Sequence, residues 1–496
     1  MLIQVENIAA KILRANDDER SWLSDYLSFP DEKAKFRRGP VWQKGDGKVH
    51  MMSDLTGTFP AGFMDIVKKA AKEEGHAIDF VDKRKRPVPY DPKGTVDWLR
   101  DYQLEAIQIA KKTERGVFHH TTGAGKTEIM VALGEVYPCR WLILTHSKDL
   151  LAQTCERFAR RTGEEVGQIG DGVFAPKRVT AATFQTMFKR LKARDAKLLK
   201  FLDTIQGVMV DECHVAAADT FWRVIMSLKN AFYRYGFSGT PFARSDKKSI
   251  FTWGAIGPII HRISAELLQQ KGVLAKPRIS MLPVAQTVLE TTWTEVYEKA
   301  VVSSVPRNEV VMYAAGKLAT KPCLLFVNHV KHGKLLEAEL RARGHKVEFV
   351  WGSAKLAVRQ AAIRRLVHGD TDILLCNVIF QEGIDIPELQ SVVIAQGGKS
   401  IIAALQRVGR GTRRRAANGD VTKEEFEVFD IADRGCGCSG VKKHLGCRWI
   451  EKHARGRKAA YASEKYEVKL DAVAAGIALN GSSLLSDAKR ALDGGS

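Results

Sequence analysis

Two successive series of short apolar segments, separated by longer stretches with helical periodicity, place the strongest constraint on how this chain folds. Parallel strands need a connection of about a dozen or more residues, which is usually a helix, so this alternation is typical of βαβ units. We therefore predict an α/β fold with two doubly wound parallel-sheet domains, one after the other. The expected strands lie at 117–119, 141–145, 179–182, 208–210 and 233–237 in the first domain, and at 323–327, 347–351, 373–376, 392–395 and 426–431 in the second.

The flanking segments have other patterns. In the first 92 residues, charged helix-like stretches flank a strand-like part near 48–52, and 63–71 has the apolar spacing of an amphipathic helix. A small α+β domain is expected there, ending in a basic, proline-rich run from Lys83 to Pro92. The predicted domains are 1–92, 93–272 and 273–450, followed by a basic helical extension at 451–496 with a frayed end.

The charge balance indicates the kind of partner. A net charge of +20 over 496 residues points to a polyanion. Nucleic acid is favoured over a membrane, because the chain has no apolar run of about 18 residues. No secretory signal pattern is visible and most cysteines are isolated, so a cytosolic location is expected. The basic run before residue 92 is either a solvated segment or a contact with nucleic acid.

A glycine-bounded loop with a lysine follows the first expected strand. The sequence at 119–127 is HHTTGAGKT, and an apolar helical stretch comes next. Gly123 and Gly125 let backbone N–H groups approach phosphates, and the helix N-terminus adds its positive dipole end. Lys126 would reach the β- and γ-phosphates, and the Thr127 hydroxyl would ligate magnesium. The order of strand, loop and helix favours a nucleotide site over a plain glycine turn.

That loop departs from the usual phosphate-loop pattern at one position. The pattern has a glycine five residues before Gly125, where this chain has His120. The match is therefore partial. The predicted loop contacts are Thr122, Gly123, Ala124, Gly125, Lys126 and Thr127.

An acidic pair ends another expected strand. Asp211 and Glu212 follow the apolar segment 207–210, which places them at the carboxyl edge of a parallel sheet, where ligands bind. Asp211 would hold magnesium, and Glu212 would orient and deprotonate an attacking water. An acidic start of a helix is the alternative. The lysine loop upstream favours the interpretation of Asp211 and Glu212 as catalytic residues.

These residues resemble the motifs of a known family. Asp211-Glu212-Cys213-His214 resembles the DExH box of superfamily-2 helicases, and the other motifs follow in that family's order across 99–415. The matching segments are LRDYQ at 99–103, THS at 145–147, ATFQ at 182–185, SGTP at 238–241, LFVN at 325–328, QEGIDIP at 381–387 and QRVGRGTR at 406–413.

The resemblance implies two tandem RecA-like domains that use ATP and Mg²⁺ and bind nucleic acid. Gln406, Arg410 and Arg413 would reach from the second domain to the γ-phosphate, which makes closure depend on ATP. By resemblance, Arg100 and Gln103 would contact adenine, Gly383 and Asp385 would bind the nucleotide, His214, Ser238 and Thr240 would couple hydrolysis to movement, and Thr145, Ser147, Thr183 and Asn328 would contact the nucleic-acid backbone.

Within the superfamily the chain is similar to UvsW-type phage recombination helicases and their XPB-like relatives. The stretch from Val49 to Ile78 and the compact second domain carry this likeness. It implies duplex or branched DNA as the substrate, with branch migration or fork remodelling as the activity. Two alternatives stay open: an RNA-directed helicase, and a nucleic-acid clamp with little hydrolysis.

A cysteine cluster near the end of the second domain raises the question of a metal. Cys436, Cys438, His444 and Cys447 are four candidate zinc ligands. Their spacing is not that of a usual zinc knuckle, and a glycine-rich turn followed by a basic helix explains them as well. We expect no zinc here.

Overall fold

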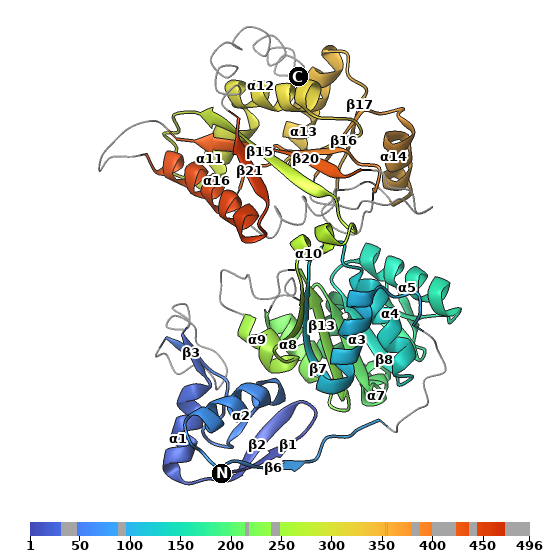
Figure 1. Ribbon diagram of the computed structural model, residues 1–496, viewed down its shortest axis with the longest axis vertical. Coiled ribbons are helices and arrows are strands. Elements are labelled where there is room, and N and C mark those ends of the chain that lie inside the picture. Colours follow the sequence, from blue (N-terminus) through green and yellow to red (C-terminus); the bar gives the residue numbers. More distant parts are fainter. Residues whose placement is uncertain are drawn as a thin grey trace. The chain divides into compact units, whose positions relative to one another are not determined.

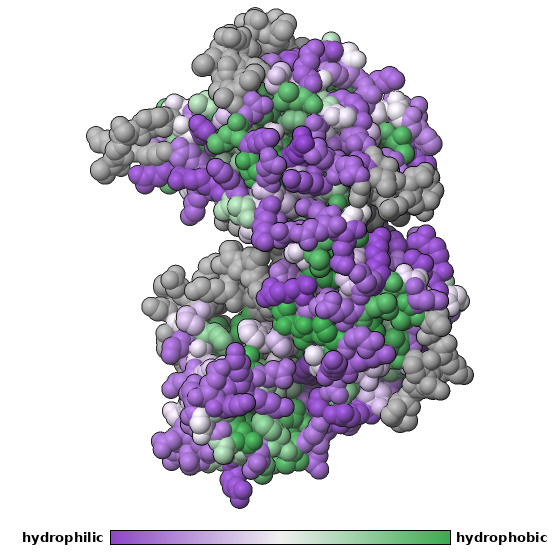
Figure 2. Space-filling model, viewed as in Figure 1, coloured by the Kyte–Doolittle hydropathy of each residue, from purple (hydrophilic) through white to green (hydrophobic). Residues whose placement is uncertain are grey.

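The computed structural model describes residues 1–30, 47–87, 96–213, 218–239, 249–352, 354, 356–377, 386–398, 423–435 and 444–471. The chain forms two compact units, Met1–Ile263 and a second that begins at Ser264 (Figure 1). Hydrophilic side chains cover most of the visible face of each unit (Figure 2). Within the described ranges, no helix is both long and apolar enough to cross a bilayer.

The first unit begins with a small α+β domain. Its main sheet has the strand order β5-β2-β1-β6, with β1 and β2 antiparallel and β1 and β6 parallel. Asn16 and Glu19 form a capping box that starts α1. The elements are β1 (Leu2–Val5), β2 (Ala9–Arg14), α1 (Asp17–Tyr26), β3 (Ser28–Pro30), β4 (Lys48–His50), β5 (Thr58–Pro60), η2 (Ala61–Phe63), α2 (Met64–Glu73) and β6 (Asp79–Asp82).

The rest of the first unit is an α/β domain. Its sheet order is β10-β9-β11-β8-β12-β13-β7-β14, and every pairing is parallel except that of β10 with β9. The elements are α3 (Asp101–Thr113), β7 (Arg115–His120), α4 (Lys126–Val136), β8 (Trp141–Thr145), α5 (Lys148–Thr162), β9 (Gly167–Gly170), β10 (Val173–Ala175), β11 (Val179–Thr183), α6 (Phe184–Lys192), α7 (Ala196–Asp203), β12 (Gly207–Asp211), α8 (Ala218–Met226), β13 (Tyr233–Ser238), α9 (Ser249–Ala255) and β14 (Ile259–Ile263).

Helices cover both faces of this sheet (Figure 1). Along β8, Trp141 and Ile143 pack in the layer that contains α3, α4 and α5, whereas Leu142 and Leu144 pack in the layer that contains α6, α7 and α8. All five residues of β8 are buried. A strand covered on both faces needs a continuous apolar sequence, which explains why these strands read as uninterrupted apolar runs.

The second unit repeats this architecture. Its parallel sheet has the order β17-β18-β16-β19-β20-β15-β21. The elements are α10 (Ala265–Gln270), β15 (Lys276–Ala285), α11 (Trp293–Tyr297), η3 (Glu298–Val302), α12 (Val305–Tyr313), η4 (Ala314–Leu318), β16 (Cys323–Phe326), α13 (Val330–Ala342), β17 (Val347–Val350), α14 (Leu356–His368), β18 (Ile373–Cys376), β19 (Ser391–Ile394), β20 (Glu425–Arg434), α16 (Leu445–Ser463) and β21 (Glu467–Leu470).

All ten predicted strands of the two α/β domains are present, but the sheets contain further strands. The sequence reading missed β9, β10, β14, β15 and β21. The prediction for the first residues of the chain was also wrong, because β1 and β2 occupy a stretch expected to be helix-like. The second unit begins at Ser264, before the boundary predicted at residue 273. The segment after residue 450, predicted to be helical, holds most of α16 and also β21, which pairs with β15.

The small domain is docked on the α/β domain of the same unit. Phe63 and Met64 belong to a buried cluster against which the partly buried Phe251 and Trp253 of α9 pack. Arg115, at the start of β7, is buried, and its Nη2 donates to the Asn7 carbonyl oxygen at 2.5 Å. Burial lowers the pKa of Arg115 to about 10. Apolar packing and a buried hydrogen bond therefore join the two domains.

The basic run that follows β6 contributes to the same docking. Arg84 Nη2 lies 2.8 Å from Asp82 Oδ2, and Arg84 Nη1 lies 2.9 Å from Glu114 Oε2. Arg86 Nη1 lies 3.3 Å from Glu114 Oε1, and both guanidinium groups lie over the Phe232 ring. The two arginines are thus paired within the protein and fasten the end of the small domain to its neighbour.

Substitution of Gly62 tests this docking. A Cβ at Gly62 would lie 2.2 Å from the Trp253 carbonyl oxygen and 2.4 Å from that of Gly254. We expect Gly62→Ala to push η2 away from α9 and to cost about 1–3 kcal/mol. Hydrogen exchange in η2 and α9 should rise. Gly456→Ala, where a Cβ meets nothing within 4 Å, is the control. Unchanged exchange in η2 would contradict the docking.

Candidate active site

The predicted motifs of the first unit meet at one edge of its sheet. In the strand register, Thr183 pairs with Thr145, Asp211 with Phe237, and Ser238 with His119. Because β11, β8, β12, β13 and β7 are parallel neighbours, their carboxyl ends lie side by side. Residues up to about 120 positions apart in sequence are thereby brought together, as expected for a ligand site in an open α/β sheet.

The loop between β7 and α4 has the backbone that a phosphate site needs. Gly123 and Gly125 have φ values of 86° and 78°, a region that favours glycine. Gln103 is buried under this loop, and its Nε2 donates to the Ala124 carbonyl oxygen at 3.0 Å. A Cβ at Gly125 would lie 2.3 Å from Gln103 Nε2. The predicted adenine-contacting glutamine and the predicted phosphate loop are therefore in direct contact.

Gln103 also starts the helix that carries it. Its Oε1 accepts a hydrogen bond from the backbone N–H of Arg100 at 2.9 Å, and Arg100 is the N-cap of α3. The Arg100 side chain donates from Nη1 to the Tyr102 hydroxyl at 3.0 Å. Gln103 thus fixes the N-terminus of α3 with one atom and the loop with another.

The lysine of the loop and the acidic pair form one charged group. Lys126 Nζ lies 3.2 Å from Glu212 Oε1 and 3.4 Å from the His120 carbonyl oxygen. The side chains of Lys126 and Glu212 are 11% and 17% exposed, so the pair is shielded but accessible. The structure therefore joins the two halves of the predicted ATP site.

The acidic pair is held by its backbone. The Glu212 N–H donates to Asp211 Oδ1 at 3.0 Å, and the Cys213 N–H donates to the Phe237 carbonyl oxygen at 3.1 Å. Glu212 has a φ of 45°, in the left-handed region that non-glycine residues seldom adopt. Strained backbone of this kind is common at functional sites, where the surrounding structure enforces it.

Burial and the neighbouring Glu212 charge raise the pKa of Asp211 to about 6. Two adjacent carboxylates with one lysine leave negative charge that is poorly solvated. Oxygen donors with such an excess of charge are what Mg²⁺ prefers. Asp211 therefore fits a magnesium site, and Thr127, in the first turn of α4 beside Lys126, is the predicted second ligand.

The predicted nucleic-acid contacts of the first unit lie at the ends of β8 and β11. The buried Thr145 donates from Oγ1 to the Ser147 carbonyl oxygen at 3.2 Å, and Ser147 Oγ accepts from the Leu150 N–H to cap α5. Thr183 Oγ1 caps α6 by accepting from the Thr186 N–H. In this structure these hydroxyls hold the loops at the carboxyl ends of β8 and β11 and cap the helices that follow them.

In the second unit, two buried arginines hold the loop after β19. Arg457 of α16 is ion-paired with Asp430 at 2.8 Å and donates from Nη1 to the Gly398 carbonyl oxygen at 2.8 Å. Arg307 of α12 is ion-paired with Asp433 at 2.7 Å and donates to the Ala395 carbonyl oxygen at 2.8 Å. This loop leads in sequence toward the predicted arginine motif at 406–413. No sequence pattern pointed to these two pairs.

Several predicted site residues lie outside the described residues. They are His214, Thr240, Gly383, Asp385, Gln406, Arg410, Arg413, Cys436 and Cys438. Asn328 follows β16 and is half-buried, and His444 is the N-cap of α16. Cys447 is buried, and its sulfur accepts from the Val288 N–H at 3.2 Å. Among the described residues, no group of three or more His, Cys, Asp or Glu side chains could hold a metal ion.

The sequence reading did not assign a role to the histidines of β7. His119 Nε2 lies 3.0 Å from the Gly239 carbonyl oxygen, and His119 Nδ1 lies 2.7 Å from Arg262 Nη1. His120 Nε2 lies 2.9 Å from His261 Nδ1. The only signal was negative: His120 stands where the phosphate-loop pattern has glycine.

Comparisons with known proteins agree with this arrangement. Residues 97–243 match the family described as the res subunit of type III restriction enzymes, and 308–415 match the helicase conserved C-terminal domain, together roughly half of the chain. The ATP-dependent DNA helicase uvsW of Enterobacteria phage T4 is 24% identical over 491 residues, covering 91% of this chain and 95% of that protein.

A second relative covers less of the chain. The DNA 3'-5' translocase XPB2 of Sulfurisphaera tokodaii is 25% identical over 356 residues, covering 64% of this chain and 79% of that protein. Among solved structures, the ATP-dependent type ISP restriction-modification enzyme LlaBIII bound to DNA is similar, with a TM-score of 0.54 and 17% identity over 81% of this chain and 32% of that chain. At that identity the likeness shows the fold alone.

Proposed function

Because the chain belongs to the superfamily-2 helicases, we propose that it is an ATP-driven motor that moves on double-stranded or branched DNA. The observation that carries the proposal is the 3.2 Å contact between Lys126 Nζ and Glu212 Oε1, beside Asp211 at the carboxyl edge of the sheet. The two relatives reported above are named as a DNA helicase and a DNA translocase, which favours DNA over RNA. A net charge of +20 agrees with a polyanionic partner.

The ion pair suggests how the site changes when ATP binds. A γ-phosphate is a stronger partner for an ammonium group than a single carboxylate, so ATP would draw Lys126 away from Glu212. Glu212 would then accept a proton from the attacking water. Asp211 and Thr127 would hold Mg²⁺, which neutralises charge on the phosphates. The lysine thus keeps the base occupied until the triphosphate arrives.

The second lobe would complete the site. We assign the γ-phosphate contacts to Gln406, Arg410 and Arg413, and further nucleotide contacts to Gly383 and Asp385. An arginine supplied from another domain stabilises the transition-state charge and makes closure depend on ATP. Coupling is assigned to His214, Ser238 and Thr240. Thr145, Ser147, Thr183 and Asn328 are assigned to the nucleic-acid backbone, and the small N-terminal domain to DNA contact.

The decisive experiment compares polynucleotides. ATP turnover is measured with single-stranded DNA, duplex DNA, a four-way junction and RNA at one salt concentration, with Lys126→Ala as the control for contaminating ATPase. We expect duplex and junction DNA to stimulate turnover and the junction to be remodelled. Stimulation by RNA but not by duplex DNA would favour an RNA helicase instead. Binding without stimulation by any of the four would indicate a clamp.

Gln103 gives a prediction about nucleotide choice. Gln103→Ala removes the proposed adenine contact and also the hydrogen bond to the Ala124 carbonyl oxygen. We expect the KM for ATP to rise roughly tenfold, since a lost buried hydrogen bond costs about 1–3 kcal/mol. The preference for ATP over GTP should shrink. Gln168→Ala, on β9, is the matched control. If the Gln103→Ala variant keeps the wild-type preference for ATP over GTP, the adenine assignment is contradicted.

A further inference from the structure

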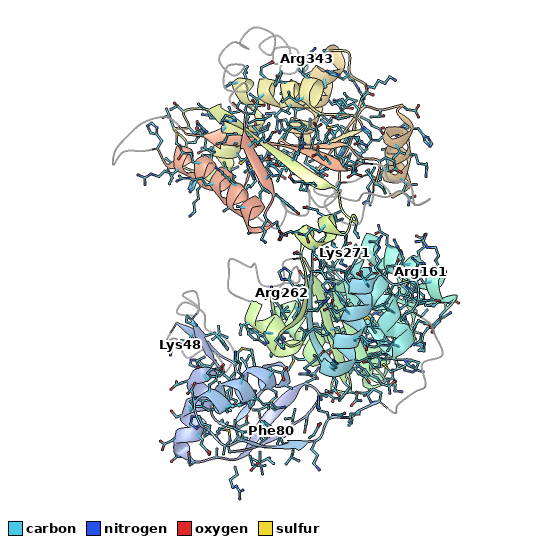
Figure 3. The ribbon with its side chains drawn as sticks, in the orientation of Figure 1. Lys48, Phe80, Arg161, Arg262, Lys271 and Arg343 are labelled. Atoms are coloured by element: carbon cyan, nitrogen blue, oxygen red, sulfur yellow. The ribbon has the colours of Figure 1, made fainter. Side chains whose placement is uncertain are left out.

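A chain of hydrogen bonds crosses three adjacent strands at the carboxyl edge of the first unit. In the strand register, His119 of β7 pairs with Ser238 of β13 on one side and with Arg262 of β14 on the other. His119 Nε2 lies 3.0 Å from the Gly239 carbonyl oxygen, and His119 Nδ1 lies 2.7 Å from Arg262 Nη1. Figure 3 labels Arg262 on β14. One imidazole therefore connects the ends of all three strands.

The chemistry of the two partners fixes the state of this histidine. A guanidinium group only donates hydrogen bonds and a carbonyl oxygen only accepts them. Nδ1 must therefore be the acceptor toward Arg262, and Nε2–H must be the donor toward Gly239. His119 is thus neutral, with its proton on Nε2. Burial first, and then the Arg262 charge, lower the pKa of His119, which agrees with a neutral ring.

The three connected segments have different roles in the proposed motor. Gly239 belongs to the Ser238–Gly239 turn of the proposed coupling motif. His119 directly precedes His120, whose carbonyl oxygen lies 3.4 Å from Lys126 Nζ. Arg262 belongs to β14, whose last residue, Ile263, accepts a backbone hydrogen bond from the Thr121 N–H at 3.1 Å. The phosphate loop, the coupling turn and the last strand of the first unit thus share one anchor.

A second contact ties two of these strands together. His120 Nε2 lies 2.9 Å from His261 Nδ1, and His261 Nε2 lies 3.8 Å from Glu105 Oε2 on α3. This contact keeps β7 and β14 in register beside the phosphate loop. It does not reach the coupling turn, because only His119 has a bond to Gly239 among the described histidine contacts. Among the described histidines, His119 is therefore the one whose side chain joins the coupling turn to the strand that leads into the phosphate loop.

We propose that His119, oriented by Arg262, is a positioning residue that ties the coupling turn at Ser238–Gly239 to the phosphate loop, so that ATP hydrolysis is transmitted to movement on DNA. The proposal rests on the proposed motor function and adds a residue to it. The hydrogen bonds given for His119 go to Gly239 and Arg262, and His119 belongs neither to the phosphate loop nor to the acidic pair. Its loss should raise the amount of ATP consumed per product rather than stop ATP turnover.

Two amide substitutions at His119 test its two hydrogen bonds one at a time. Glutamine places a donor near the position of Nε2, so His119→Gln keeps the bond to Gly239. Asparagine places its amide near the position of Nδ1 and falls short of Gly239. We expect His119→Asn to raise the ATP used per junction remodelled roughly tenfold, with the KM for ATP unchanged, and His119→Gln to stay within about threefold of wild type. His368→Asn, an exposed histidine of α14, is the control.

Several outcomes would overturn the inference. An ATP cost per product in His119→Asn equal to that of the wild type would do so, as would equal defects in the two amide variants. Should His119→Asn not fold, Arg262→Ala, whose contact with His119 is exposed, carries the same test with a smaller expected defect.

A measurement that needs no motor activity separates this inference from the proposed function. The ¹⁵N chemical shifts of the His119 ring should show a protonated Nε2 and a bare Nδ1 that do not change between pH 6 and 8, roughly the range in which an ordinary histidine titrates. A ring that titrates normally, or that carries its proton on Nδ1, would refute the anchor even in an active enzyme. If the wild-type protein has this tautomer but no DNA-stimulated ATPase activity, the proposed motor function is wrong. The proposed hydrogen bonding of His119 is then still supported.

Discussion

Glu212→Gln is expected to reduce DNA-stimulated ATP turnover at least about a hundredfold while ATP still binds. General base catalysis contributes about 10²–10⁴ in rate, and glutamine keeps the volume of the side chain without its basicity. Lys126, which lies 3.2 Å from Glu212 Oε1, loses its anionic partner in this variant and stays available for the phosphates. ATP affinity should therefore hold or increase. Turnover is followed by phosphate release, and affinity by the binding of a fluorescent ATP analogue.

Two further variants make this result specific. Glu135→Gln changes a partly buried carboxylate of α4 that is paired with Arg178, and it should turn over ATP within about twofold of wild type. Lys126→Ala should lose both turnover and tight binding, because the group that reaches the phosphates is gone. Full turnover by Glu212→Gln would mean that another group activates the water and that the ATP site is misassigned.

The second large effect concerns the buried Arg457–Asp430 pair of the second unit. Arg457 and Asp430 are 1% and 0% exposed, and Tyr461 also donates to Asp430 at 2.7 Å. Arg457→Met leaves a carboxylate buried with too few partners, which is expected to cost about 3–5 kcal/mol. The loop at Gly398 loses its contact with α16 as well. In urea, the second unit should unfold at a lower denaturant concentration than in the wild type. Hydrogen exchange should rise more in β20 than in β8.

The comparison with a neighbouring arginine and with a double variant isolates the cause. Arg455 lies two residues away on α16, is 76% exposed and pairs only with Glu451 among its described contacts. Arg455→Met should change stability by less than about 1 kcal/mol. Asp430→Leu combined with Arg457→Met removes both charges and should recover much of the loss. A single Arg457→Met variant as stable as Arg455→Met would show that the pair contributes little.

The central strands of both α/β domains could be predicted from sequence because both of their faces are covered. Strands such as β8 and β16 are fully buried and read as continuous apolar runs. The strands at or near the sheet edges could not be read this way. Glu467–Leu470 is largely exposed and polar, and Gly167–Gly170 contains only one apolar side chain. β15 contains Pro277 and Pro283, and proline is uncommon inside strands because it lacks a backbone N–H to donate.

The residues of the candidate active site also differ in how far they could be predicted from sequence. The phosphate loop and the acidic pair could be predicted because each is a local pattern with a chemical reason for its spacing. The contact of His119 with Gly239 joins residues 120 positions apart, and that of Arg457 with Gly398 joins residues 59 apart. A single histidine or arginine has no pattern around it that reveals such a partner. Positioning residues therefore become visible only once the strand order is known.

The docking of the small N-terminal domain has a consequence for how motion is transmitted. Among the described residues, contacts of Arg115 and Arg84 and the packing of Phe63 beside α9 join this domain to the α/β domain that carries the phosphate loop. Each ATP-driven displacement of that α/β domain would therefore carry the small domain along as a rigid arm. A fluorophore on α2 would therefore report the displacement of the α/β domain of the first unit.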